Sequence, residues 1–382
     1  MLTQSTSGQA GSAQEGSAQE GFGGALRRVV KALDAVAAPH GIDRYIELVS
    51  PTWSTTEVRG RIVGVRRQTS NTVTLTIEAN RNWRGFAAGQ YTQLTVEIDG
   101  VRHTRCYSMA TSATAPGRLF ELTVKAHPGG LVSNFLVSRA QPGTVVGLTR
   151  AQGDFTLPAE RQKRILLLSG GSGITPVLSM LRTLCAEGHS GPVTFVHYCL
   201  TAGDLTYAAE LGEIAARHPN VRIVKIFTDE PGAGDFDGFV SVDQLDAIDD
   251  SWRAAETYLC GPAPLMAAAA AIYTDANLGT QLHTEAFTLT QWTAEAPDVS
   301  GAIRFTSSRT EVRSDGRTIL DQAEGAGLSP KSGCRMGICH SCICPLVSGT
   351  VRNVVTGVVT TDRGQDIQIC VSAPVGDVEI DL

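Results

Sequence analysis

The sequence predicts a multidomain protein with an antiparallel β-barrel domain, a parallel-sheet α/β domain and a small α+β domain, in that order. Three observations predict it. The 382 residues exceed the size of one ordinary domain, short strands give way to alternating strands and helices, and three cysteines lie close together near the C-terminus. The predicted boundaries are 1–24 for a disordered tail, 25–54 for an N-terminal helical segment, 55–160 for the barrel, 161–285 for the α/β domain, 286–300 for a linker and 301–382 for the small domain.

Composition excludes several classes of function. Charged residues make up 18% of the chain, the net charge is -6 and no polybasic run occurs, so a nucleic-acid partner is not indicated. The longest apolar runs, at 165–168 and 267–273, are far shorter than the ~20 residues of a transmembrane helix. The start of the chain lacks a signal-peptide pattern, and nine cysteines without a disulfide framework fit a reducing compartment. We therefore expect a cytoplasmic location.

The first fifty residues have two different patterns. The tandem repeat Gly-Ser-Ala-Gln-Glu at 11–20 is poor in apolar side chains, which predicts a flexible tail. From Ala25 to Val36, apolar residues recur at helical spacing with basic residues between them. Such a helix most often packs on its own domain, and peripheral contact with the inner face of a membrane is the alternative.

Short β-rich runs separated by Gly, Pro and Asn predict an antiparallel barrel or sandwich for the first domain. Residues 105–108 read Arg-Cys-Tyr-Ser and follow one of these strands, with Arg105 and Tyr107 on one face. An aromatic ring can stack on a cofactor, a guanidinium can bind phosphate, and the Ser108 hydroxyl can hydrogen-bond a ring nitrogen. Alone, the four residues fit an ordinary surface strand equally well. The expected strands are 58–65, 72–77, 91–96, 119–124 and 144–148.

Two glycine-rich turns precede predicted helices. Gly129 and Gly130 open a helix near Leu131, where backbone N–H groups can meet a pyrophosphate and Ser133 can add a hydroxyl. Residues 168–176, Leu-Ser-Gly-Gly-Ser-Gly-Ile-Thr-Pro, lie between a strand and a helix, the context of a phosphate-binding turn. This turn departs from the G-x-G-x-x-G pattern.

The α/β domain is predicted from continuous apolar strands that alternate with helices. Its strands are expected at 165–168, 193–197, 221–227 and 257–259. Cys260, Gly261 and Pro262 follow the last of them, at the edge where open α/β sheets bind ligands. Cys260 could border a nicotinamide, and a buried small residue is an equal alternative. Glu285 and Phe287 close the domain.

The C-terminal cysteines have the spacing of an iron–sulfur site. Cys334, Cys339 and Cys342 read C-x4-C-x2-C, and Cys370 follows, which is the ligand pattern of plant-type [2Fe-2S] clusters. Structural zinc and metal-free cysteines are the alternatives. Zinc sites favour paired C-x2-C motifs, whereas this stretch has one C-x2-C and a lone His340. The sequence therefore favours a one-electron centre.

The order of these motifs resembles the ferredoxin reductase superfamily, followed by a C-terminal plant-type ferredoxin domain. The motifs are R-C-Y-S, G-G-L-V-S, G-G-S-G-I-T-P, C-G-P and E-A-F, and with the four cysteines they extend over residues 55–382. The resemblance implies an FAD-binding β-barrel, an NAD(P)-binding α/β domain and a β-grasp [2Fe-2S] ferredoxin domain. It also implies an NAD(P)H oxidoreductase that transfers electrons. FMN is the alternative flavin, but the phosphate-binding segment at 129–133 favours FAD.

The resemblance also implies roles for individual residues. Arg105, Tyr107 and Ser108 would hold the flavin, and Ser108, Cys260 and Glu285 would lie beside the reacting rings. The flavin phosphates would be held by Lys125, Gly130, Leu131, Val132 and Ser133, the pyridine nucleotide by Gly170, Gly171, Ser172, Gly173, Thr175, Cys260, Gly261 and Pro262, and the cluster by Cys334, Cys339, Cys342 and Cys370.

The whole layout is most similar to actinobacterial reductases that serve a membrane di-iron acyl-CoA (stearoyl-CoA) desaturase. This resemblance implies electron flow from NADPH through FAD and [2Fe-2S] to a desaturase, and so a part in fatty acid desaturation and lipid metabolism. A reductase for a ring-hydroxylating, steroid or alkane oxygenase is the alternative of the same class. A redox sensor, with slow nucleotide turnover, is the alternative of another class.

Two further expectations concern specificity. Many relatives place an arginine for the 2′-phosphate of NADPH where this chain has Leu200, which locally favours NADH. Because the resemblance favours NADPH, we predict NADPH, with another donor replacing the arginine. In the cluster loop, Arg335, Met336 and Ile338 lie between ligands and are the predicted docking surface for the acceptor.

Overall fold

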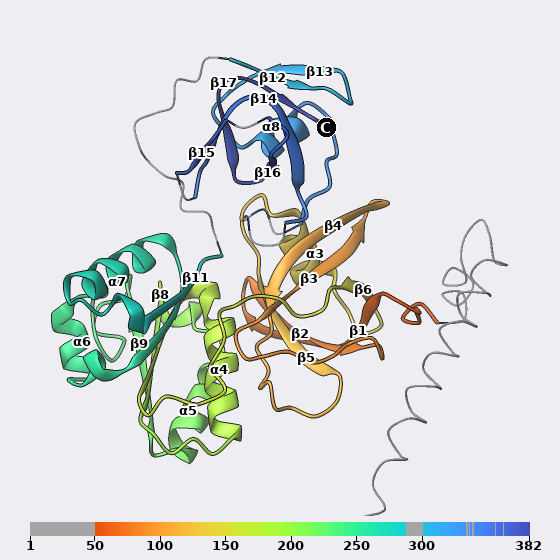
Figure 1. The fold of residues 1–382 in the computed structure, drawn as a ribbon. Helices are drawn as coiled ribbons and strands as arrows, with labels where there is room; N and C mark the ends of the chain where they lie inside the picture. The colour runs from red at the N-terminus through yellow and green to blue at the C-terminus, as the bar shows by residue number, and fades with distance from the viewer. Residues whose placement is uncertain are drawn as a thin grey trace, which may run out of the picture.

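The computed structural model describes residues 50–287, 301–333, 335, 337, 340–355, 357–361 and 363–382. Three sheets follow one another along the chain (Figure 1), and the first and third each have one hydrophobic core while the second has one on each face. The expected tail, the predicted helix at 25–36 and residues 288–300 of the expected linker lie outside the described residues. None of the helices in the described ranges is both long and apolar enough to cross a membrane.

The first domain is an antiparallel sheet that curls into a half-barrel. An isolated bridge between Met109 and Leu122 joins its two edge strands, and helix α3 (Leu131–Arg139) contributes Val132 and Leu136 to the core. The sheet order is β4-β3-β6-β1-β2-β5. Its strands are β1 (Val58–Thr69), β2 (Thr72–Ala79), β3 (Tyr91–Ile98), β4 (Val101–Ser108), β5 (Leu119–Lys125) and β6 (Val145–Leu148).

The five predicted strands of this domain are confirmed, but one placement is wrong. Residues 105–108 do not follow a strand; they are the second half of β4, which pairs with β3 along its whole length. The sequence concealed this strand because Arg102, His103 and Arg105 interrupt the apolar alternation by which a half-buried strand is recognised.

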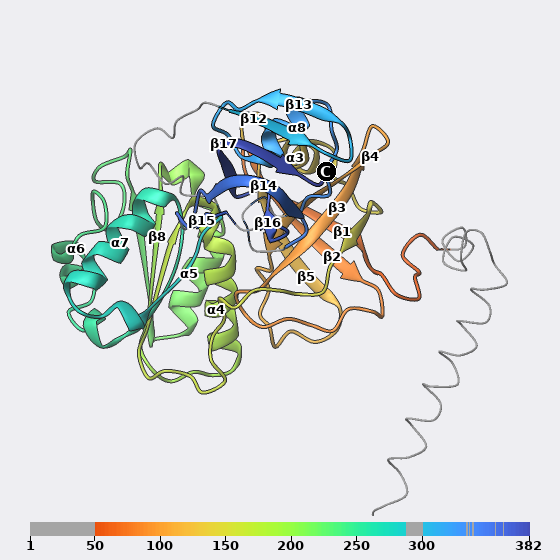
Figure 2. The same cartoon turned by 45° about the horizontal axis from the view of Figure 1, so that its top comes forward.

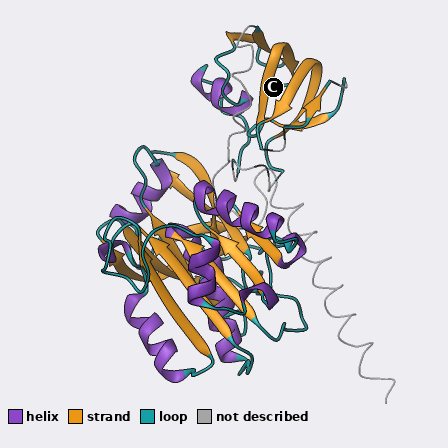
Figure 3. Cartoon of the chain, turned by 90° about the vertical axis from the view of Figure 1, so that its left-hand side faces the viewer, coloured by secondary structure: helices purple, strands orange, loops and turns teal. Residues whose placement is uncertain are grey.

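The second domain is a parallel sheet with helices on both faces (Figure 3). Helices α4 (Ile174–Ala186) and α5 (Ala208–Arg217) share one core, and α6 (Val242–Ile248) and α7 (Ala263–Asp275) share the other. All residues of β7 and β8 are buried, which agrees with the apolar run at 165–168, although β8 also buries Thr194 and His197. The strand order is β11-β10-β7-β8-β9, and the strands are β7 (Ile165–Gly170), β8 (Val193–Cys199), β9 (Val221–Phe227), β10 (Glu256–Cys260) and β11 (Leu282–Glu285). Single turns of 3-10 helix lie at η1 (Gly171–Gly173), η2 (Ala202–Asp204), η3 (Trp252–Ala254) and η4 (Gly279–Gln281).

Helix α4 joins the first two domains. The core that it shares with α5 also contains Ala110, Phe155 and Leu157 from the half-barrel side. On the same helix, Arg182 binds Glu210 of α5 through Nε at 2.6 Å and Glu121 of β5 through Nη1 at 2.9 Å. Because apolar packing and ion pairs act together at this junction, the two domains are held in one orientation.

The third domain is a mixed sheet with helix α8 (Ile319–Gly325) packed on it, the arrangement predicted for a ferredoxin domain. Strand β12 runs parallel to β17, and the other pairs are antiparallel. Figures 1 and 2 show this domain beside β4 and α3 of the half-barrel. Its strands are β12 (Ala302–Phe305), β13 (Thr310–Arg313), β14 (Ile343–Asn353), β15 (Val359–Thr360), β16 (Asp366–Gln368) and β17 (Ser372–Ile380).

Candidate active site

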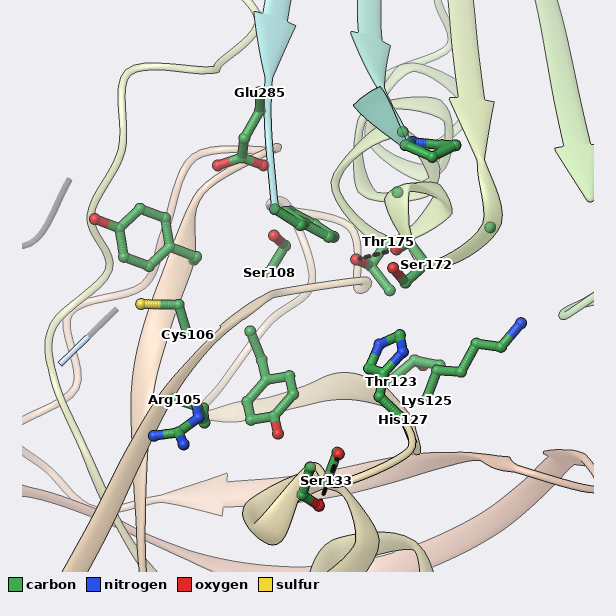
Figure 4. A pocket seen from close by; sticks show the side chains of 18 of the residues that line it. Arg105, Cys106, Ser108, Thr123, Lys125, His127, Ser133, Ser172, Thr175 and Glu285 are labelled. Atoms are coloured by element: carbon green, nitrogen blue, oxygen red, sulfur yellow. Dashed lines mark hydrogen bonds between the residues drawn. The ribbon is translucent and has the colours of Figure 1, made fainter. Parts of the chain in front are cut away.

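A cavity of about 550 Å³ lies between the half-barrel and the carboxyl edge of the parallel sheet (Figure 4). It contains nearly all the residues that the sequence predicted for flavin and nucleotide. The predicted residues that line it are Arg105, Tyr107, Ser108, Lys125, Gly130, Leu131, Val132, Ser133, Gly170, Gly171, Ser172, Gly173, Thr175, Gly261, Pro262 and Glu285.

Two polar side chains face the cavity from opposite domains. Ser108 ends β4 and Glu285 ends β11, and Figure 4 shows the carboxyl group directed toward the hydroxyl. Burial raises the pKa of Glu285 to about 8, and the Ser108 hydroxyl opposes the shift. Within the described part of the chain, Ser108 Oγ and Glu285 Oε2 are buried without completing a hydrogen bond. Buried polar atoms of this kind fit a ligand that supplies polar partners, as the ring edge of a flavin or nicotinamide does.

Among the residues predicted for the flavin and the nucleotide, Cys260 does not line the cavity. It ends β10 with no solvent exposure, and burial together with Glu285 raises the pKa of its thiol well above the ordinary value. Its carbonyl oxygen packs against Gly173 so closely that a Cβ on residue 173 would collide with it. The backbone of Cys260 therefore packs against the glycine turn outside the cavity, and Gly261 and Pro262 line the cavity itself.

The glycine turn after β7 has the geometry of a phosphate-binding loop. Gly171 has φ +53°, and a Cβ on Gly170 would lie 2.7 Å from Pro262 Cδ. No side chain caps the N-terminus of α4, so the positive end of the helix dipole faces the turn, although the Ile174 N–H already bonds the Gly171 and Ser172 carbonyls. Thr175 Oγ1 donates to the Ser172 carbonyl at 3.2 Å, which holds the turn against the helix. The turn fits the pyrophosphate of a nicotinamide nucleotide.

A second anion site is formed by the start of α3. Gly130 is its N-cap residue and no side chain caps the helix. A Cβ on Gly130 would lie 2.5 Å from Ser133 Oγ, so only glycine leaves this approach open. Arg105, whose Nη1 donates to the Thr104 carbonyl at 2.7 Å, lies on the same side of the cavity as Ser133 in Figure 4. A flavin pyrophosphate fits between them.

Two predicted residues of this region have altered electrostatics. Burial raises the pKa of Tyr107, which keeps its phenol neutral. Burial and the nearby charge of Arg335 lower the pKa of Arg105. Lys125 contacts the other domain, since its Nζ lies 3.4 Å from Asp204 Oδ1. Its predicted role at the flavin phosphates stays a prediction.

Several lining residues were missed by sequence reasoning. Thr123 could have been found, because it precedes Lys125 by two residues on the same face of β5. Tyr91 could not, because only the pairing of β3 with β4 places it opposite Ser108. Phe287 was placed in the E-A-F motif at the end of the α/β domain without a role, and it lines the cavity and packs on the core around α4. His127 and Cys106 complete the lining.

The structure brings together two of the four predicted cluster ligands. Cys342 and Cys370 are buried in the core of the third domain, and Ile369 N donates to the Cys342 carbonyl at 3.2 Å. The adjacent Gln368 donates through Nε2 to the Gly337 carbonyl at 2.6 Å and so ties down the loop. Cys334 and Cys339 lie outside the described residues. Two buried thiols on adjoining backbone, beside a loop with Gly337 at φ +76°, fit the predicted [2Fe-2S] site.

Arg335, from the loop predicted to dock the acceptor, is paired within its own domain. Its guanidinium pairs with Glu324 of α8, with Nη1 at 2.9 Å from Oε2, and its charge acts on Arg105 of the half-barrel. Met336 and Ile338 lie outside the described residues. The ion pair fixes Arg335 against α8 while leaving its side chain 32% exposed, and the docking role of this loop stays a prediction.

Comparison with protein families assigns a module to each domain. Residues 62–157 match the oxidoreductase FAD-binding domain, and residues 167–271 match the oxidoreductase NAD-binding domain. Residues 304–375 match the 2Fe-2S iron–sulfur cluster binding domain. The three matches agree with the predicted cofactors.

Three individual proteins match most of the chain. The NADPH oxidoreductase of Mycobacterium tuberculosis is 38% identical over 362 residues, 94% of this chain and 92% of that protein. The glycine betaine monooxygenase reductase subunit of Pseudomonas aeruginosa is 31% identical over 320 residues, 78% of this chain and 87% of that protein. Phthalate dioxygenase reductase, described as a modular structure for electron transfer from pyridine nucleotides to [2Fe-2S], superposes with a TM-score of 0.59 at 25% identity and covers 85% of this chain and 97% of its own.

Proposed function

Because the chain belongs to the family of ferredoxin-reductase-type oxidoreductases that carry FAD-binding, NAD-binding and C-terminal [2Fe-2S] domains, we propose that it supplies electrons to an iron-dependent desaturase or oxygenase. It is an NAD(P)H-dependent reductase. The observation that carries the proposal is the closeness of the two candidate redox sites. Arg105 lines the cavity that contains Ser108 and Glu285, and the charge of Arg335, from the cluster loop, acts on Arg105.

The residues of the cavity perform defined tasks in this reaction. FAD supplies the conversion between two-electron and one-electron transfer, and [2Fe-2S] chemistry supplies single-electron transfer. The glycine turn at 170–173 binds the pyrophosphate of the nucleotide and fixes its distance from β4. Ser108 orients the flavin ring, and the apolar ring of Phe287 in the cavity wall helps to exclude water.

The carboxyl group of Glu285 holds a proton near neutral pH. Because its pKa is about 8, the carboxyl group is mainly protonated at pH 7 and can donate a hydrogen bond into the cavity. A neutral carboxyl also avoids a buried charge beside the reacting rings, which would be costly in this environment. Glu285 is thus a hydrogen-bond donor near neutral pH and an anion in alkaline solution.

We propose a membrane di-iron acyl-CoA desaturase as the first acceptor. The proposal rests on the similarity in layout to actinobacterial desaturase reductases, and it is supported by the match over 94% of the chain to the M. tuberculosis NADPH oxidoreductase. In that role the cluster domain would meet its partner at the inner face of the membrane, as a peripheral contact.

A soluble oxygenase component is the second candidate acceptor. The names of two relatives support it, because one is the reductase subunit of a glycine betaine monooxygenase and the other the reductase of a phthalate dioxygenase. Both acceptor classes require single electrons from an iron–sulfur donor, so the flavin and nucleotide sites would be the same for either.

Reconstitution separates the two acceptors. The purified holoprotein is mixed with membranes that contain an acyl-CoA desaturase, and separately with a purified oxygenase component, and product formation is followed with NADH and with NADPH. Nucleotide-dependent desaturation supports the first candidate. Stimulation of the oxygenase alone removes the desaturase and leaves the reductase class. Flavin reduction too slow for turnover in stopped-flow measurements would instead support a redox sensor.

A further inference from the structure

The end of β8 is acidic at the place where the two nicotinamide nucleotides differ. We propose that this chain selects NADH over NADPH through the carboxylates of Asp204 and Glu230, an inference that rests on the proposed reductase function. This selectivity would set it apart from the name of its M. tuberculosis relative, NADPH oxidoreductase.

The position of the adenosine ribose follows from the sheet order. The phosphate-binding turn ends β7, and β8 is the neighbour of β7, with Gly170 paired to Tyr198. In open parallel sheets, the ribose next to the pyrophosphate lies off the carboxyl end of the adjacent strand. In this chain that end is formed by Cys199, Leu200 and Thr201. The 2′ group of the ribose, a hydroxyl in NADH and a phosphate in NADPH, would therefore contact this end of β8.

Two carboxylates are built into this strand end. Glu230 Oε2 accepts the Ala202 N–H at 2.7 Å, so the loop after β9 is joined to the loop after β8. Asp204 Oδ2 accepts from Thr201 Oγ1 at 2.9 Å. Both carboxylates act on the Cys199 thiol at the end of the strand: after burial, the nearby charges of Asp204 and Glu230 raise its pKa, and Lys125 opposes them.

Lys125, a cation close to this strand end, is already paired. Lys125 Nζ lies 3.4 Å from Asp204 Oδ1, and this contact with the Thr201 hydrogen bond outweighs burial and lowers the pKa of Asp204. Asp204 is therefore ionised at neutral pH. Glu230 adds a second carboxylate at the same strand end.

The two described segments that follow β8 and β9 offer no basic replacement for the missing arginine. Leu200 is 54% exposed and offers an apolar side chain at the strand end. The segments 200–216 and 228–252, which follow β8 and β9, contain neither lysine nor arginine, and the second contains several acidic residues. The donor that we expected to replace the arginine is therefore absent from both segments, and the sequence-based preference for NADPH is not supported here.

The chemistry of the two nucleotides follows from these charges. A ribose 2′-hydroxyl can donate a hydrogen bond to a carboxylate, which is the usual device of NAD-binding sheets. A 2′-phosphate would bring its negative charge against Asp204 and Glu230, where Lys125 is already paired with Asp204. Selectivity therefore arises mainly from rejection of the phosphate.

The test compares both nucleotides on the FAD- and cluster-loaded protein. Steady-state reduction of ferricyanide gives kcat/KM for NADH and for NADPH, and calorimetry gives Kd for NAD⁺ and NADP⁺ without turnover. We expect NADH to be favoured roughly tenfold or more in both measurements. Added salt should narrow the difference by improving NADPH, because it screens the repulsion.

Variants assign the effect to the two carboxylates. Glu230→Gln removes one charge and should lower the NADH/NADPH ratio by about threefold to tenfold through a lower KM for NADPH. Leu200→Arg combined with Glu230→Gln should lower it further, because a guanidinium then meets the phosphate. Glu213→Gln is the matched control: it removes one exposed carboxylate from α5 and should leave the ratio unchanged.

The outcomes separate this inference from the proposed function. Equal or better use of NADPH by the unmodified protein, or a ratio that Glu230→Gln does not change, overturns the inference and leaves the reductase function standing. Failure of both nucleotides to reduce the flavin overturns the proposed function itself.

Discussion

The carboxyl group of Glu285 faces the hydroxyl of Ser108 across the cavity, and the two residues come from different domains. Burial raises the pKa of Glu285 from 4.5 to about 8. Between these two values the folded chain retains a proton that the unfolded chain releases. Unfolding therefore releases a proton in this window, and stability falls as the pH rises from about 4.5 to 8.

Glu285→Gln should remove this pH dependence. The variant is expected to resemble the unmodified chain at pH 5 and to be more stable at pH 9, by up to about 4 kcal/mol if the whole shift is expressed. Urea unfolding at several pH values measures it, with the exposed Glu213→Gln as control. A stability difference that does not grow with pH would show that Glu285 ionises normally.

Ser108→Ala should slow flavin reduction while leaving the free energy of unfolding nearly unchanged. Its hydroxyl is buried without completing a hydrogen bond within the described part of the chain, so its removal should change the free energy of unfolding by less than about 1 kcal/mol. Flavin reduction by nucleotide should slow about 10-fold to 100-fold, because the ring loses a positioning contact. Stopped-flow absorbance at saturating nucleotide checks the rate. An unchanged rate would remove Ser108 from the site.

Arg182→Met should loosen the junction of the first two domains. Arg182 is 15% exposed, and its loss leaves Glu121 and Glu210 without their shared partner. We expect a destabilisation of about 3 kcal/mol. Arg217→Met removes an exposed arginine that pairs with Glu213 within α5, and it should cost less than about 0.5 kcal/mol. Chemical denaturation compares the two, and equal effects would contradict the role of Arg182.

Gly173→Ala should abolish nucleotide binding while preserving the flavin site. A methyl group there would collide with the Cys260 carbonyl and displace the turn. Gly212→Ala, in α5 with open space around it, should be neutral or stabilising by up to about 1 kcal/mol. Calorimetry with NAD⁺ and flavin fluorescence give the two readouts. Retained nucleotide affinity in Gly173→Ala would contradict the assignment of the turn.

The elements that the sequence predicted best are those whose residues lie close together in the chain and form a recognisable pattern. The strand at Ile165, the glycine turn and the helix at Leu131 each combine apolar pattern with glycine chemistry, and all are confirmed. Strand β4 was missed because its outward side chains are charged, and β11 because it has four residues.

The cavity shows the limit of sequence reasoning. Glu285 and Ser108 are 177 positions apart in the chain, and a family resemblance, not local pattern, brought them together. Tyr91 and the Lys125–Asp204 contact depend on strand register and domain packing, which no local pattern encodes. The same applies to Arg335, whose partner Glu324 is known only once α8 is placed against the loop.

The central claim, that electrons leave through the C-terminal cluster, is tested most directly by Cys370→Ser. The buried Cys370 is a predicted ligand, whereas Cys344, half-buried in the same domain, is not, so Cys344→Ser is the matched control. Reduction of ferricyanide reports on the flavin, and reduction of cytochrome c reports on transfer to a protein. Cys370→Ser should lose the visible absorption of the cluster and about a hundredfold in cytochrome c reduction, with ferricyanide reduction nearly unchanged, and Cys344→Ser should retain all three. Full cytochrome c reduction by Cys370→Ser lacking its cluster would contradict the account.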